Sequence, residues 1–170
     1  TARMQTPYVR EYNEEREVCA WFLLDLSPSV DFGSHLVKKR AIAADFVATL
    51  AQILTRHGNR AGAVFYSGQV DRVIPARSGR RHVLHILHHL LTRPELKQSA
   101  PTQLGDLLRS AHQAIQRRSL VFVLSDFISA PGWAEPLGHL AQRHEVIAVR
   151  LYDPLEMVLP DLGLGVVQDA

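Results

Sequence analysis

Three stretches of the chain are almost wholly apolar, with no alternation between hydrophobic and polar positions. They are Cys19–Leu26, Ala61–Ser67 and Ser119–Asp126. This pattern is typical of strands that are covered on both faces, as in a parallel sheet between layers of helices. Glu145–Asp153 predicts a fourth strand, and the turn-rich tail has room for a short last strand at Gly165–Gln168.

A different pattern marks Val70–Ala76, which alternates between apolar and polar residues and contains Pro75. Proline cannot donate a backbone hydrogen bond to a neighbouring strand. This segment is therefore expected at an exposed edge of the sheet.

Between the predicted strands, apolar residues recur at helical spacing. The predicted helices are Leu36–Arg56, His82–Leu91, Leu104–Ile115 and Trp133–Arg143. Strands and helices in this order predict an α/β fold: a Rossmann-like open, mostly parallel sheet with helices on both faces and one antiparallel edge strand. The sequence has no internal repeat or linker. We therefore expect a single domain over 1–170, with a core over 18–153, a lead-in segment over 1–17 and a C-terminal tail over 154–170.

Charge and composition narrow the classes of function. A formal net charge of +2 gives no reason to expect a nucleic-acid partner. The longest apolar runs have strand length, about five to seven residues, so none predicts a membrane span. The single cysteine, Cys19, excludes an internal disulfide and fits a reducing compartment. The expected location is the cytoplasm, and an upstream membrane anchor in a longer chain stays open.

Two of the buried strands end in an acidic residue, Asp25 and Asp126. In open α/β sheets, ligands bind beyond the carboxyl ends of the strands. Ser27 and Ser29 follow Asp25 at every second position, and residues two apart on an extended chain point the same way. If the two strands are neighbours, the carboxylates repel each other unless one keeps its proton or a cation lies between them.

Carboxylate and hydroxyl oxygens favour a hard divalent cation such as magnesium, manganese or calcium, with magnesium the first expectation. Thr102 is the remaining candidate ligand. It follows Pro101 directly before the predicted helix that begins at Leu104. Its hydroxyl is therefore expected to face the same strand ends.

These residues resemble the metal-ion-dependent adhesion site of von Willebrand factor type A domains. The resemblance rests on the D-x-S-x-S of Asp25, Ser27 and Ser29, on a later threonine that opens a helix, Thr102, and on an aspartate that closes the next buried strand, Asp126. It implies that these five residues bind the cation, directly or through water. It also implies that an acidic side chain of a partner protein completes the coordination.

Longer stretches look like one bacterial branch, the family catalogued as domain of unknown function 58. They are VREYNEERE, DLSPSVDFGS, VLSDF and LYDPLEMVLPDLG, and the resemblance covers the chain from Arg3 onward. Members of that family commonly accompany MoxR-type AAA+ ATPases, which implies such an ATPase as a partner in the assembly or maturation of a complex. The chain departs from the branch at Val30, where methionine is common, and in lacking the branch's upstream part.

Each candidate ligand also has a purely structural interpretation. Asp25 could cap the turn after its strand, Ser27 and Ser29 could serve the turn around Pro28, and Thr102 could be a helix N-cap. Taken together, these interpretations leave unexplained why both acids end buried strands. Metal binding explains all five residues at once.

The main alternative is a metal-dependent phosphoryl-transfer or hydrolytic enzyme in which Asp25 is the nucleophile or a metal ligand. The haloacid-dehalogenase pattern needs a second carboxylate two residues later, where this chain has Ser27. Neither a phosphate-binding glycine loop nor a G-x-S-x-G motif occurs. We therefore expect a divalent-metal-dependent protein-binding module without catalysis. A structural protein with an empty site is the third hypothesis.

Two further clusters have simpler interpretations. The histidines of His82–His89 share the polar side of an amphipathic helix, which favours a solvent-facing surface over a zinc or pH-sensing site. The basic runs Lys38–Arg40 and Arg77–Arg81 are expected to be solvated.

Overall fold

The structure is a computed structural model that describes residues 17–31, 38–94 and 101–154. Its strands are β1 (Cys19–Asp25), β2 (Arg60–Tyr66), β3 (Val70–Arg77), β4 (Leu120–Ser125) and β5 (Glu145–Arg150). Its helices are α1 (Pro28–Asp31), α2 (Lys39–Arg56), α3 (Arg80–Leu91), α4 (Leu104–Ala114) and α5 (Ala134–Arg143).

The five strands form one open sheet in the order β3-β2-β1-β4-β5. Strands β2, β1, β4 and β5 are parallel, and β3 pairs antiparallel with β2 at one edge. The prediction of an open, mostly parallel α/β fold with an antiparallel edge strand is thus confirmed. The carboxyl ends of β1 and β4 lie side by side at the end of the sheet where the parallel strands finish. This end is called the sheet edge below, as distinct from the edge strand β3.

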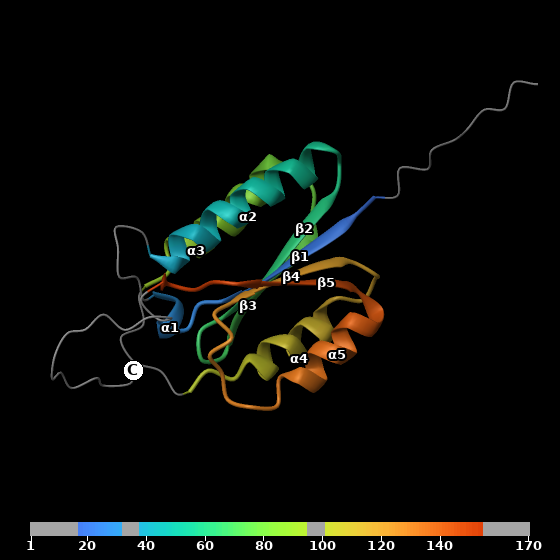
Figure 1. The fold of residues 1–170 in the computed structure, drawn as a ribbon. Coiled ribbons are helices and arrows are strands. Elements are labelled where there is room, and N and C mark those ends of the chain that lie inside the picture. The colour runs from blue at the N-terminus through green and yellow to red at the C-terminus, as the bar shows by residue number, and fades with distance from the viewer. Residues whose placement is uncertain (1–16, 32–37, 95–100, 155–170) are drawn as a thin grey trace, which may run out of the picture.

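Helices cover both faces of this sheet, α2 and α3 on one face and α4 and α5 on the other (Figure 1). Successive residues of β1 point to opposite faces. Phe22 and Leu24 therefore pack in the core beneath α2 and α3, while Trp21 and Leu23 pack beneath α4 and α5. Burial on both faces explains why this strand shows no polar alternation.

Some predicted segments lie outside the described residues. They are the last strand at Gly165–Gln168, nearly all of the lead-in segment and of the tail, and the first residues of the helix predicted over Leu36–Arg56. Among the described residues, no helix is long and apolar enough to cross a membrane.

The histidine-rich helix α3 is less simply amphipathic than its sequence indicates. His82 is half-buried, and its Nε2–H donates to the Ala61 carbonyl at 2.8 Å. Leu84 and Leu91, by contrast, are 53% and 64% exposed. The prediction that the histidines simply face solvent is therefore wrong for His82, which fastens α3 to β2.

His144, between α5 and β5, makes stability depend on pH. It is 5% exposed, and burial lowers the pKa of its imidazole below the usual 6.5, with Arg143 and His112 adding to the effect. As the pH falls through 6.5, the unfolded chain takes up this proton before the folded protein does, so stability present above that pH is lost. We expect urea-unfolding curves to show this loss, and His144→Leu to reduce it. The pKa values of His82 and His89 are also lowered, so part of the pH dependence of stability should remain in this variant. An identical slope in His144→Leu would contradict the assignment.

Candidate metal centre

The two acids predicted as ligands leave neighbouring strands at the same edge of the sheet. Strands β1 and β4 pair in parallel with Leu24 opposite Leu124, so Asp25 lies beside Ser125 and one residue short of Asp126. Both carboxylates are buried, with Asp25 1% and Asp126 2% exposed. Two acids that lie close together and out of solvent need a cation or a proton.

The Asp25 carboxylate is held by two hydrogen bonds. Its Oδ1 accepts the backbone N–H of Ser27 at 3.0 Å, and its Oδ2 accepts the hydroxyl of Ser125 at 2.6 Å. Burial raises the pKa of the Asp25 carboxyl, the hydrogen bonds from Ser125 and Ser27 lower it, and the negative charge of Asp126 adds to the rise. This environment favours neutralisation of Asp25, which a bound cation would provide as well as a proton does.

Ser27 and Ser29 bring their hydroxyls together, with the two Oγ atoms 3.1 Å apart. The backbone conformation that brings them together differs from the one predicted from the sequence. An extended chain was expected to align them, but Pro28–Asp31 forms the short helix α1, and the Val30 N–H donates to the Ser27 carbonyl at 2.9 Å. A turn, and not strand alternation, therefore makes the two side chains converge.

Thr102 is tied by its backbone to the segment that follows β4. Its carbonyl accepts the Ala130 N–H at 2.9 Å and the Ser129 hydroxyl at 2.8 Å. The next residue, Gln103, donates its N–H to the Tyr66 hydroxyl at 2.8 Å. Tyr66 is the residue of β2 that lies opposite Asp25 of β1 in the sheet. Thr102, 9% exposed, thus lies at the sheet edge where β1, β2 and β4 end.

The structural alternative for Thr102, a helix N-cap, is not what the structure shows. The N-cap position of α4 is Gln103, and it makes no side-chain capping bond. The Leu104 N–H instead donates to the Ser129 hydroxyl at 2.9 Å, so a residue from another loop caps the helix. The Thr102 side chain is therefore not committed to capping α4.

Asp126 has one oxygen that is satisfied and one that is not. Its Oδ1 accepts the Ile128 N–H at 3.0 Å. Its buried Oδ2 accepts no hydrogen bond from the described residues, and lies 3.6 Å from the Lys39 ammonium. A buried carboxylate oxygen without a hydrogen bond is rare and suits a position that a bound cation would occupy.

The chain turns sharply directly after Asp126. Phe127 has a φ of 62°, a left-handed conformation that non-glycine residues seldom adopt. Two contacts hold it there: its N–H donates to the Ser125 hydroxyl at 2.9 Å, and its ring lies 5.6 Å from that of Trp133. Strained backbone of this kind tends to occur at functional sites.

The basic run Lys38–Arg40, expected to be solvated, is largely not. Lys39 is 2% exposed and reaches Asp126. Arg40 donates to the Leu90 and Arg93 carbonyls, each at 2.7 Å. The prediction is therefore wrong for these two residues, because packing α2 against α3 and against the strand ends buries them.

Three buried residues at this edge are not predicted from the sequence to lie beside the candidate ligands. Ser125 donates to Asp25, Lys39 pairs with Asp126, and Asp153 follows β5 with 6% exposure. The acid at the end of the predicted Glu145–Asp153 strand was an available signal for Asp153. Neither Ser125 nor Lys39 differs in sequence from an ordinary strand-end serine or surface lysine.

The donor set fits a hard cation. Within the described residues, no group of three or more histidine, cysteine, aspartate or glutamate side chains could hold a metal ion. The candidate donors are instead two carboxylates and three hydroxyls. The oxygens gathered at the sheet edge are carboxylates and hydroxyls, which suit magnesium, manganese or calcium. We use "the candidate site" below for Asp25, Ser27, Ser29, Thr102 and Asp126.

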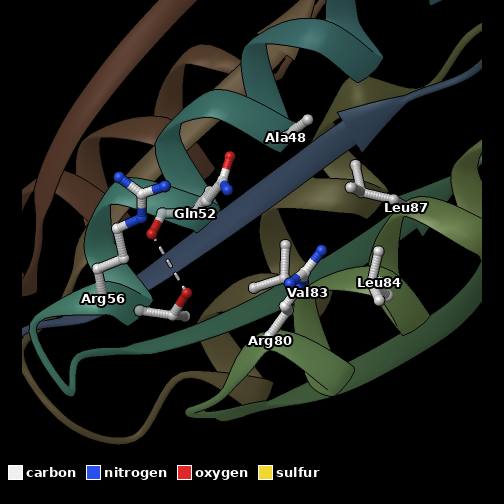
Figure 2. A pocket seen from close by; sticks show the side chains of 8 residues that line it. Ala48, Gln52, Arg56, Arg80, Val83, Leu84 and Leu87 are labelled. Atoms are coloured by element: carbon white, nitrogen blue, oxygen red, sulfur yellow. Dashed lines mark hydrogen bonds between the residues drawn. The ribbon is translucent and has the colours of Figure 1, made fainter.

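Three hollows in the surface lie outside the candidate site. A groove of about 310 Å³ separates α2 from α3, with Gln52 and Arg56 on one side and Leu84 and Leu87 on the other (Figure 2). A hollow of smaller volume lies beside His89, and one of comparable volume lies between α4 and α5. None of the three is lined by a residue of the candidate site.

The chain is similar to proteins of known sequence along its whole length. The family described as "Protein of unknown function DUF58" matches residues 1–170. The uncharacterized proteins Rv1480 of Mycobacterium tuberculosis and Mb1516 of Mycobacterium bovis are each 35% identical over all 170 residues. The chain spans about half of these relatives, 54% of their length.

Solved structures share the fold at low sequence identity. An aerotolerance-related membrane protein from Bacteroides fragilis matches with a TM-score of 0.65 and 16% identity, over 79% of this chain and 67% of its own. The conserved hypothetical protein BatB from Bacteroides thetaiotaomicron matches with a TM-score of 0.64 and 15% identity, over 78% and 66%. At such identities the likeness shows a common α/β fold.

Proposed function

The chain belongs to the DUF58 family, and we propose that it is a protein-binding module that acts through a bound divalent cation. In this proposal the domain is von Willebrand A-like. The candidate site binds the cation, most readily magnesium, and an acidic side chain of the partner protein binds to that cation. The partner is proposed to be a MoxR-type AAA+ ATPase or a protein assembled with its help.

One observation carries the proposal. Two buried carboxylates end neighbouring strands, beside a pair of hydroxyls 3.1 Å apart, and one carboxylate oxygen has no hydrogen bond from the described residues. A divalent cation at this edge would offset the repulsion between Asp25 and Asp126, and it could coordinate the second oxygen of Asp126, which the Lys39 ammonium approaches only to 3.6 Å.

The charge of the donors supports a binding role. Ser27, Ser29 and Thr102 offer neutral hydroxyls, so only two carboxylates of the candidate site face a doubly charged ion. The ion would keep a strong attraction for one more anionic oxygen, which a glutamate or aspartate of a partner can supply.

The alternative of a phosphoryl-transfer enzyme finds less support. Asp25 would have to act as the nucleophile, yet it is 1% exposed and both of its oxygens accept hydrogen bonds. None of the three hollows is lined by Asp25. Turnover of a generic phosphate ester that requires magnesium and disappears in Asp25→Asn would favour this alternative.

A capture experiment from bacterial extract tests the binding role. We expect the immobilised wild-type protein with magnesium to retain a partner that a chelator releases. Ser27→Ala removes one hydroxyl ligand and should retain at least about tenfold less of it, since each lost ligand weakens the hold on the ion. Ser110→Ala, on α4 and outside the candidate site, is the matched control and should retain the wild-type amount. Equal capture by all three proteins with and without chelator would contradict the proposal.

A further inference from the structure

Lys39 places a positive charge inside the protein, next to the candidate site. It is the first residue of α2, and its Nζ lies 3.6 Å from Asp126 Oδ2. The side chains of Lys39 and Asp126 are 3% and 1% exposed. Because so little water reaches this pair, their charges are weakly screened and act strongly on anything bound nearby.

The backbone that carries Lys39 is fixed from the other side. Arg40, the next residue, donates from Nη2 to the Leu90 and Arg93 carbonyls at the end of α3. These bonds hold the first turn of α2 against the end of α3. The packing of α2 against α3 therefore holds the Lys39 ammonium near the strand ends, whereas a lysine on the surface would move freely in solvent.

We infer that Lys39 is a built-in cation of the candidate site that weakens binding of the divalent ion alone and strengthens binding of an anionic partner group to the loaded site. This inference rests on the proposed function. The ammonium repels an incoming divalent ion and competes with it for Asp126. Once the ion is bound, the same positive charge leaves the site more attractive to a carboxylate.

The consequence is coupling between ion and partner. A site with too few positive charges would hold its ion tightly and have little attraction left for an acidic side chain. With Lys39 in place, the ion is held less tightly on its own and gains more when a carboxylate arrives. Replacing Lys39 should therefore change the two affinities in opposite directions, which a packing role alone does not predict.

Manganese is the probe for the first affinity, because its binding can be followed by electron paramagnetic resonance. We expect Lys39→Met to bind Mn²⁺ about tenfold more tightly than wild type, since a positive charge a few ångströms from the ion is removed. Lys39→Arg keeps the charge and should stay close to wild type. Lys38→Met makes the same change of net charge at an exposed neighbour and should also stay close to wild type.

Acetate is the probe for the second affinity. At constant ionic strength, acetate should tighten Mn²⁺ binding in the wild type and do so several-fold less in Lys39→Met. Unchanged or weaker Mn²⁺ binding in Lys39→Met, with binding intact in the wild type, would overturn the inference and leave the metal site standing. If neither wild type nor Lys39→Met bound Mn²⁺, the proposed metal site itself would be wrong, and the inference with it.

The unfolding temperature of Lys39→Met, measured with and without Mn²⁺, provides a further test. Without metal, Lys39→Met should unfold at a lower temperature, and Mn²⁺ should raise that temperature more than in the wild type. Recovery of the fold on adding Mn²⁺ supports the inference, because the ion then replaces the ammonium. If Mn²⁺ fails to restore Lys39→Met and Lys39→Arg is equally unstable, Lys39 serves packing and the inference is overturned.

Discussion

Replacing Asp126 with alanine is expected to lower the free energy of unfolding by about 3–5 kcal/mol, because breaking a buried ion pair leaves the other charge inside the protein. The Lys39 ammonium lies 3.6 Å from this carboxylate, and both side chains are almost fully buried. The substitution also removes the acceptor for the Ile128 N–H. We expect Mn²⁺ binding to disappear at the same time. Urea denaturation measures the first effect and titration with Mn²⁺ the second.

Two further variants separate the ion pair from a general loss of charge. Asp45→Ala removes an exposed acid on α2 and should change the free energy of unfolding by no more than about 0.5 kcal/mol. The double variant Lys39→Met/Asp126→Ala should be more stable than Asp126→Ala alone, because it no longer buries an ammonium without this carboxylate. Losses that simply add in the double variant would show that the two groups do not interact.

Phe22→Ala is the second change with a large expected effect, a loss of about 3–5 kcal/mol in the free energy of unfolding. Phe22 lies on the central strand β1 and is fully buried. Its ring stacks on that of Phe122 of β4, with centroids 5.4 Å apart, and Phe46 of α2 meets Phe122 edge-on at 5.9 Å. The truncation would leave a cavity between the sheet and α2. Urea denaturation followed by tryptophan fluorescence gives the free energy.

Ile53→Ala is the matched comparison, since this apolar residue of α2 is 51% exposed. It should cost no more than about 0.5 kcal/mol. Equal losses in Phe22→Ala and Ile53→Ala would mean that the aromatic group between β1, β4 and α2 does not stabilise the fold as its packing indicates.

The fold could be predicted because burial leaves a direct trace in the sequence. Phe22 and Leu23 point to opposite faces of the sheet and are both buried, so the β1 segment reads as one apolar run. Pro75 marked β3 as an edge strand, and the structure places it there. The short helix α1 was missed, because Ser27-Pro28-Ser29 is equally compatible with a simple turn.

The candidate site was predictable in its residue types but not in its details. The acids at the ends of β1 and β4 pointed to it, since parallel neighbours end at the same edge. The burial of Lys39 could not be inferred, because a lysine in a basic run is usually solvated and only the packing of α2 shows otherwise. The cap of α4 by Ser129 depends on a contact between residues 25 positions apart in the sequence, which no local pattern indicates.

Diffraction from crystals soaked in Mn²⁺, recorded at a wavelength where manganese scatters anomalously, is the most direct measurement of the central claim. Our account predicts one strong anomalous peak at the sheet edge, bonded directly to the Ser27 and Ser29 hydroxyls and directly or through one water molecule to Asp25 and Asp126. A well-occupied peak elsewhere, with only water beside the two hydroxyls, would contradict it.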